Sequence, residues 1–211
     1  FYECENLREQ VLSDSIEILE QGVFYKCHTI KQITLPTQLK RIDHGVFAGC
    51  SSLEEIKLPS TLEFIGNMAF AGCAVLRTIT IPEGVTSLPK QMCQGCTRLF
   101  RANLPDGLYA IGDEAFAGCL LLEKVNIPKS TFRIGVRAFH NCQQLESIAL
   151  MPTNIHMIEE GAFQECKMLM DIELPEKLKV LSNAVFAQCI SLKTIKFNQK
   201  LREIGNGAFY N

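Results

Sequence analysis

Two cysteines three positions apart have the residue types and spacing that most suggest chemistry in this chain. Cys93 and Cys96 lie in the segment QMCQGCTRL and form its one C-x-x-C. Such a pair carries thiol–disulfide exchange when it joins a strand to a helix, and it supplies two of the roughly four ligands of a structural zinc site. No histidine and no second C-x-x-C stands at a matching spacing. We therefore favour a structural role over a redox or metal site.

The flanking sequence supports this reading, because nine of the ten cysteines, Cys96 among them, form a periodic series. Successive members are 23 residues apart, except for one gap of 24. A fixed period of this length indicates a solenoid, in which each repeat packs on its neighbours. Cys93 stands three residues before a member of the series, where the other repeats have phenylalanine. The series is Cys4, Cys27, Cys50, Cys73, Cys96, Cys119, Cys142, Cys166 and Cys189, and the phenylalanines are Phe24, Phe47, Phe70, Phe116, Phe139, Phe163 and Phe186.

Each repeat predicts one strand, a second extended segment and a closing turn. In L-x-x-I-x-L the last two apolar residues alternate with polar ones, as in a half-buried strand, and a proline follows in six repeats. Strands repeated in this way must run parallel, roughly 4.8 Å apart. The second segment, as in 61–66, ends at a glycine, and the segment GNMAFAGC after it predicts a helical turn that buries Ala and Phe. We expect positive φ at these glycines, which are Gly66, Gly112, Gly135 and Gly205.

The consensus L-x-x-I-x-L-P-x-x-L-x-x-I-G-x-x-A-F-x-x-C resembles the BspA-like leucine-rich repeat family, and about nine copies cover the chain. The resemblance implies a right-handed leucine-rich repeat solenoid, mostly β, with a long parallel sheet on one face and short extended segments and helical turns on the other. We expect residues 1–211 to form a single solenoid domain within a longer protein. The asparagine ladder of commoner leucine-rich repeats is missing, so the buried turn groups must find other partners. The residues in its place are Gln38, Thr61, Gly84, Gly107 and Ser130.

Two repeats depart from the pattern. The segment 149–163 carries one extra residue, with Met151 where proline is usual and Pro152 displaced by one, which predicts a bulge. In the repeat that begins at Cys119, Thr131 falls in an apolar column beside Phe132. We expect Phe132 to turn inward there.

Neither the cysteines nor the histidines predict catalysis. Cysteines on adjacent coils have parallel Cβ vectors, so we expect free, buried thiols without a bound metal or other cofactor. The histidines fall at four different repeat positions, so a paired nucleophile and base would arise only by accident of the coil. We expect no enzymatic activity. The histidines are His28, His44, His140 and His156.

Composition excludes several kinds of partner. With 211 residues and a net charge of −2, the chain has no excess of basic residues for a nucleic-acid backbone. No apolar run approaches the roughly 20 residues that span a bilayer, so we expect no membrane insertion. The absence of a starting Met and of polar terminal repeats predicts a longer parent protein, with terminal coils open to end-to-end self-association.

Function is then expected on the surface of the sheet. Outward side chains lie five and seven residues after each cysteine of the series, where they can vary without disturbing the fold. At the middle of the sheet they place an aromatic residue and two cations beside two amides, and aromatic and Arg residues are common interface anchors. This candidate partner-binding set is Phe100, Arg101, Asn103, Lys124 and Asn126.

The family resemblance favours a protein-interaction module, part of a cell-surface or secreted adhesin that binds a host cell-surface or extracellular-matrix protein. The alternative is a structural spacer within a longer array, whose partners bind elsewhere. The surface location follows from the resemblance alone.

Overall fold

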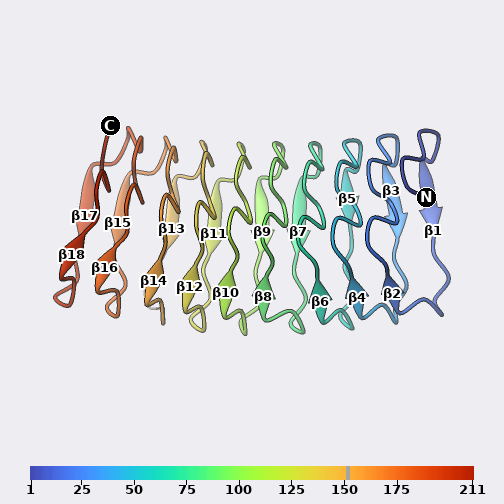
Figure 1. The fold of residues 1–211 in the computed structure, drawn as a ribbon, viewed down its shortest axis with the longest axis horizontal. Helices are drawn as coiled ribbons and strands as arrows, with labels where there is room; N and C mark the ends of the chain where they lie inside the picture. The colour runs from blue at the N-terminus through green and yellow to red at the C-terminus, as the bar shows by residue number, and fades with distance from the viewer. Residues whose placement is uncertain (151–152) are drawn as a thin grey trace.

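The chain winds into a long stack of similar coils that runs from the N-terminus at one end to the C-terminus at the other (Figure 1). The structure, a computed structural model, describes residues 1–150 and 153–211. Each coil contributes one strand to each of two parallel sheets, and a turn closes it. The predicted leucine-rich repeat solenoid is therefore confirmed. The bulge predicted at Met151 and Pro152 lies outside the described residues.

The first sheet contains the strands predicted from L-x-x-I-x-L. They pair in parallel, and each residue aligns with its counterpart one repeat later, as Gln10 does with Ile33. The strands are β1 (Glu9–Val11), β3 (Gln32–Thr34), β5 (Glu55–Ile56), β7 (Thr78–Thr80), β9 (Arg101–Asn103), β11 (Lys124–Asn126), β13 (Ser147–Ala149), β15 (Asp171–Glu173) and β17 (Thr194–Lys196).

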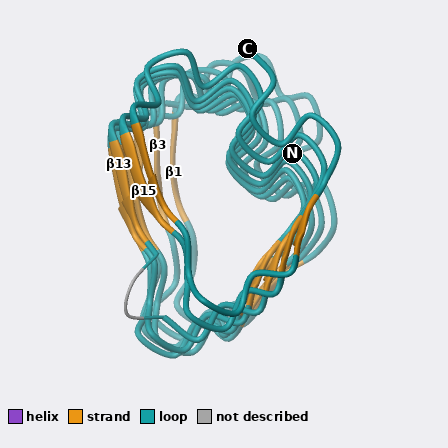
Figure 2. Ribbon diagram, turned by 90° about the vertical axis from the view of Figure 1, so that its left-hand side faces the viewer, coloured by secondary structure: helices purple, strands orange, loops and turns teal. Residues whose placement is uncertain are grey.

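The second sheet forms from the shorter extended segments on the other wall of each coil (Figure 2). Its strands have two residues each and also pair in parallel, as Ala110 does with Arg133. They are β2 (Ile18–Leu19), β4 (Arg41–Ile42), β6 (Phe64–Ile65), β8 (Ser87–Leu88), β10 (Ala110–Ile111), β12 (Arg133–Ile134), β14 (Met157–Ile158), β16 (Val180–Leu181) and β18 (Glu203–Ile204).

The closing turns are not helical, contrary to the prediction. Within one turn the Ala48 amide donates to the Gly45 carbonyl at 3.1 Å, as the first turn of a helix would allow. Gly45 and Gly49 nevertheless have φ of 60° and 76°. Left-handed residues four positions apart stop a right-handed helix from propagating, so no helix forms in the described residues.

The phenylalanine column forms one file of stacked rings inside the solenoid. The rings of Phe47 and Phe70 lie 5.5 Å apart, and those of Phe116 and Phe139 lie 5.4 Å apart. Cys93 occupies the position in the file between these two pairs. Its amide donates to the Ala115 carbonyl at 2.8 Å, and the Phe70 amide makes the equivalent bond to the Met92 carbonyl at 2.9 Å. The single inward-facing row predicted from the sequence is confirmed, with Cys93 as its one small member.

Met92 compensates for the volume that Cys93 lacks. It is fully buried at a position that other coils fill with alanine, such as Ala69 and Ala115. The pair Met-Cys thus replaces Ala-Phe with about the same total volume, and volume-conserving exchanges are the ones that a packed core tolerates best. The C-x-x-C is accommodated as a packing variant.

From Cys27 onward the periodic cysteines are buried free thiols, and each donates a hydrogen bond to the coil before it. The Cys50 thiol donates to the Phe24 carbonyl at 3.1 Å, and the same bond recurs up to Cys189 and Phe163. Burial raises the pKa of both thiols, Cys50 and Cys189, to about 12, so they stay protonated near neutral pH. Cys4, in the first coil, is half-buried.

The four glycines that end the second segment do not have positive φ, contrary to the prediction. They are required by close approach of the preceding coil. A Cβ on Gly66 would lie 2.5 Å from the His44 amide nitrogen, and one on Gly112 would lie 2.6 Å from the Leu88 carbonyl oxygen. Gly135 and Gly205 are equally crowded by backbone atoms.

The expectation for Phe132 was also wrong. Thr131 takes the inward position, fully buried, and its hydroxyl donates to the Leu108 carbonyl at 3.0 Å. This bond offsets the cost of burying the hydroxyl, so Thr131 can fill an apolar column. Phe132 instead lies on the outer surface, half-buried, with its ring stacked on Tyr109.

Hydroxyls replace the missing asparagine ladder in two coils. The Thr61 hydroxyl lies 2.8 and 2.9 Å from the Thr37 and Leu39 carbonyl oxygens, and Ser130 bridges Asp106 and Leu108 in the same way. Carbonyls of one coil are thus satisfied by a side chain of the next, as buried backbone groups require.

Candidate functional site

The outward face of the first sheet carries the side chains that the fold leaves free to vary. Each three-residue strand between β3 and β15 buries its central residue and exposes the residues on either side. The predicted set occupies two adjacent strands, β9 and β11, in which Arg101 aligns with Lys124. Phe100 directly precedes β9. The structure therefore brings the five predicted residues together in what we call the central patch: Phe100, Arg101, Asn103, Lys124 and Asn126.

The central patch has cations without local neutralisation. Arg101 and Lys124 form no ion pair within residues 1–150 and 153–211. Arg101 lies 5.9 Å from the Phe100 ring centroid, and Phe100 is 37% exposed. The Asn103 amide donates to the Thr80 hydroxyl at 3.0 Å, which fixes its orientation. An aromatic edge beside two free cations suits a partner that offers carboxylates and an apolar side chain.

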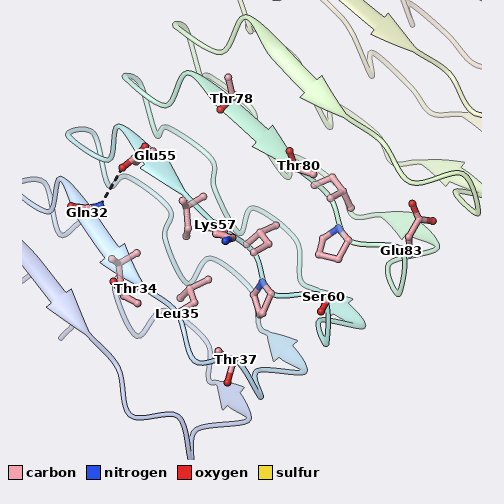
Figure 3. A pocket seen from close by; sticks show the side chains of 16 residues that line it. Gln32, Thr34, Leu35, Thr37, Glu55, Lys57, Ser60, Thr78, Thr80 and Glu83 are labelled. Atoms are coloured by element: carbon pink, nitrogen blue, oxygen red, sulfur yellow. Dashed lines mark hydrogen bonds between the residues drawn. The ribbon is translucent and has the colours of Figure 1, made fainter.

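A groove on the same face lies beside the central patch and was not predicted. It has a volume of about 1000 Å³ and spans β3, β5 and β7 (Figure 3). Its apolar lining includes Leu35, Leu58 and Ile81, while its polar part combines threonines with two carboxylates and the ammonium of Lys57. Gln32 donates to one of these carboxylates, Glu55, at 3.1 Å.

The groove forms where the strand ladder is interrupted. The Leu12 amide bonds to Thr34 at 3.1 Å and the Ile81 amide bonds to Asn103 at 3.0 Å. The equivalent amides of Leu35 and Leu58 make no backbone hydrogen bond in the described structure, although the same bond is also missing outside the groove, as at Leu104. At the groove, β5 in addition does not pair with β7.

The second sheet is interrupted at the same coil junction, between β6 and β8, and here the sequence contains a cause. In other coils the amide after the strand bonds to the coil before, as Gly66 does to Ile42 at 2.8 Å. Pro89 occupies that position after β8 and has no N–H to donate. A proline in the usual glycine column was thus the available signal for a break between residues 50–72 and 73–95.

Comparison with known proteins identifies the family to which this chain belongs. The family model for the BspA-type leucine-rich repeat region matches residues 1–100 and 86–211. The chain belongs to the BspA-type leucine-rich repeat family. No curated protein matches it significantly.

Solved structures of several bacterial proteins share the fold. A leucine-rich cell surface protein of Faecalibacterium prausnitzii A2-165 is 27% identical, with a TM-score of 0.70 over 96% of this chain and 64% of that one. The leucine-rich repeat protein of T. pallidum is 32% identical, with a TM-score of 0.66 over 72% and 70% of the two chains. The pneumococcal vaccine antigen PcpA shares the fold at 19% identity and a TM-score of 0.67, over 94% of this chain and 62% of that one. This BspA-type chain therefore spans less than two thirds of the F. prausnitzii protein.

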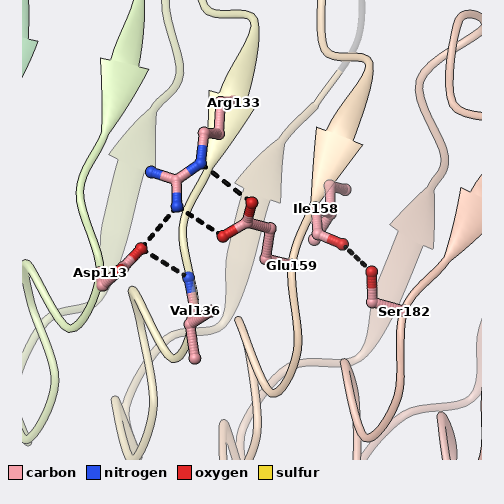
Figure 4. Close-up of polar contacts among 6 residues, drawn as sticks. All are labelled: Asp113, Arg133, Val136, Ile158, Glu159 and Ser182. Atoms are coloured by element: carbon pink, nitrogen blue, oxygen red, sulfur yellow. Dashed lines mark hydrogen bonds and ion pairs between the residues drawn. The ribbon is translucent and has the colours of Figure 1, made fainter.

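Other polar clusters of this BspA-type solenoid are structural. On the second sheet, Arg133 donates to both Glu159 oxygens at 3.0 and 2.5 Å and to Asp113 at 2.7 Å (Figure 4). Asp113 also accepts the Val136 amide at 3.1 Å. The hydrogen bonds to Glu159 and Asp113 raise the pKa of the guanidinium. The network therefore links the coil of Arg133 to the coils on either side through a guanidinium that stays charged.

No cluster in the described residues suits a metal ion, since none brings together three His, Cys, Asp or Glu side chains. Among the same residues there is no helix with the length and apolarity needed to cross a membrane.

Proposed function

We propose that this chain is a non-enzymatic protein-interaction module that binds its partner through the first sheet, at the central patch. The proposal rests on the difference between the inward and the outward residues of each strand. Interior positions repeat the same residue types from coil to coil, while the outward positions differ and leave Arg101 and Lys124 without ion-pair partners in the part of the chain that the structure describes. A regular scaffold with a variable, incompletely neutralised face suits recognition of one partner by its charge and shape.

The module belongs, in this proposal, to a cell-surface or secreted adhesin-like protein whose partner is a host cell-surface or extracellular-matrix protein. Support comes from the relatives, of which the F. prausnitzii protein is described as a cell surface protein and PcpA as a vaccine antigen. The adjoining groove over β3, β5 and β7 offers a partner an apolar depression next to the charged patch. Interfaces commonly combine these two features.

The test is a binding screen of residues 1–211 against purified matrix proteins and host cells. For the partner that binds, the double variant Arg101→Glu/Lys124→Glu is expected to lower affinity at least about tenfold, since reversing two interface charges costs more than 1.4 kcal/mol. The matched control, Lys193→Glu/Lys200→Glu, makes the same charge change at the far end and should leave affinity unchanged.

Equal affinity of the two double variants would remove the central patch from the interface. A screen without any binding partner would favour the structural spacer instead.

A further inference from the structure

A depression adjoins the central patch at the ends of β9 and β11. It has a volume of about 630 Å³ and is lined by two residues of the patch, Asn103 and Asn126. Its apolar lining includes Leu104, Ile127 and Pro128. Leu104 is half-buried, so part of its side chain is accessible. The depression therefore offers a small apolar surface next to two amide side chains.

Backbone groups are unpaired at the same place. β9 and β11 pair in register at Arg101 and Lys124, the first residue of each strand. Further along, the Leu104 amide and the Asn126 carbonyl do not bond to each other among the described residues. The Asn126 side chain also makes no hydrogen bond within residues 1–150 and 153–211. The two strands thus leave a backbone donor, a backbone acceptor and an amide group free, and these are the groups that pair with a peptide backbone.

Charge is distributed unevenly along the patch and the depression. Arg101 and Lys124 lie side by side and have no ion-pair partner among the residues that the structure describes. The depression is lined by Asp106 and Lys129, whose opposite charges offset each other. A carboxylate is therefore favoured beside the two cations, and an uncharged side chain is favoured in the depression.

The distance between these two positions fits an extended chain. Arg101 and Asn103 are two residues apart on one face of β9, which corresponds to roughly 7 Å. An extended peptide repeats the side chains of one face at the same interval. A segment that lies along the strands can therefore place one side chain at the cations and the next at the depression. A helix is about 10 Å wide with its side chains, too broad to enter between two strands that are roughly 5 Å apart.

We infer that the central patch binds an extended segment of a partner protein that carries a carboxylate and an apolar side chain two residues apart. This inference rests on the proposed function and names the part of the partner that the patch recognises. The carboxylate lies between Arg101 and Lys124, and the apolar side chain enters the depression. The Asn126 side chain bonds to the backbone of the segment, because an amide group can donate and accept at once.

The experiment is a titration of residues 1–211 with short peptides, followed by NMR of the side-chain amide signals of Asn103 and Asn126. Both chain directions are tested, with the capped peptides Ser-Asp-Ser-Leu-Ser and Ser-Leu-Ser-Asp-Ser. We expect saturable shifts for the tighter of the two, with an affinity at least about fivefold higher than for Ser-Asp-Leu-Ser-Ser. That peptide has the same composition, but in an extended chain its Asp and Leu point to opposite faces.

Two variants test the contacts one at a time. Arg101→Gln/Lys124→Gln should weaken binding at least about fivefold, because it removes both charge partners of the carboxylate. Asn126→Ala should weaken binding about threefold or more, because it removes the bonds to the backbone of the segment. Asn126 is exposed, so this variant should fold normally. The matched control is Asn67→Ala, which removes an exposed amide on a closing turn and should leave affinity unchanged.

Equal affinity for Ser-Asp-Leu-Ser-Ser, shifts that do not saturate, or full affinity in Asn126→Ala would each overturn the inference. So would tighter binding of glucuronate, since the patch would then recognise an acidic sugar. A protein partner that loses affinity in Arg101→Glu/Lys124→Glu, combined with peptides that bind regardless of spacing, would overturn the inference and leave the proposed function standing. Spacing-dependent peptide binding without any partner in the screen would support the inference and count against the host or matrix partner.

Discussion

The closing turns and the two sheets hold the same coils together to different degrees. In the turns, a backbone bond crosses from coil to coil along the whole file, with lengths such as 2.8 Å from Phe47 to Ala69 and 2.8 Å from Cys93 to Ala115. Each sheet, in contrast, divides into three sections. Both lose strand pairing between residues 50–72 and 73–95, whereas the Phe70 amide still bonds to Met92 across that junction. The turns are therefore the continuous spine of the solenoid.

The difference has a physical origin in what each region buries. Most coils combine three interactions in the spine, namely a backbone bond, a thiol-to-carbonyl bond and a stacked ring, and the interior ones are shielded from water. The strands have two or three residues and face solvent on one side, so their pairing contributes less to holding the stack. A recognition surface can vary at the outward positions of the sheets because those side chains do not pack in the core.

Raising the pH should unfold the chain by ionising the buried thiols of the spine, with the largest effect of the changes considered. Burial raises the thiol pKa of Cys50 from 9.0 to about 12, so the unfolded chain loses this proton at lower pH than the folded chain. The stabilisation is complete below pH 9 and is lost between pH 9 and about 12. Each such thiol lowers the free energy of unfolding by about 1.4 kcal/mol per pH unit in that range.

Thiolate absorbance measured together with circular dichroism checks this expectation. The two signals should change together in one cooperative transition above pH 9, with a shallower pH dependence in Cys142→Ala. If thiolate absorbance instead rises gradually while the protein stays folded, ionisation of the thiols is not coupled to unfolding, and the expectation is wrong.

A single ring deletion should separate the spine from the sheet surface. Phe139→Ala leaves a cavity in the fully buried file and should lower the free energy of unfolding by about 3–5 kcal/mol in urea denaturation. Phe64→Ala removes a ring of the same size from the outer face of the second sheet, where it is 37% exposed. It should cost less than half as much, and equal losses would contradict the comparison.

Glycine replacements should give the smallest effects and test the close contact between coils at the second sheet. Gly66→Ala places a Cβ against the His44 backbone and should cost roughly 1–3 kcal/mol. Gly107→Ala is the matched control, since a Cβ there meets nothing within 4 Å. It should leave thermal stability unchanged or raise it by up to about 1 kcal/mol. If both variants behave alike, conformational freedom of glycine, and not crowding, explains the column.

Periodicity predicted those features that repeat in every coil. The cysteine interval predicts the solenoid, and the position of Cys93 in the phenylalanine column is enough to explain the C-x-x-C. It did not reveal the left-handed residues that prevent helical turns, because non-glycine residues such as Met68 also adopt positive φ there. Phe132 was misplaced since a buried hydroxyl can find a carbonyl, a bond that no apolar pattern reports.

Sites were less predictable than the fold. Counting from the cysteines placed Arg101 and Lys124 side by side on the outer face, as the structure shows, but their binding role remains a proposal. The groove depends on where strands fail to pair, and only Pro89, in the second sheet, signals that junction in the sequence.

The sequence by itself determined the repeat, its inward files and the outward positions, because a period of 23 residues forces equivalent side chains into register. Tertiary structure alone decided how closely each coil approaches the next, and with it the crowded glycines and the groove on the first sheet. The reason is that the distance between two coils depends on packing contacts all around the coil. These contacts involve residues far apart in the sequence, so no short segment predicts the distance.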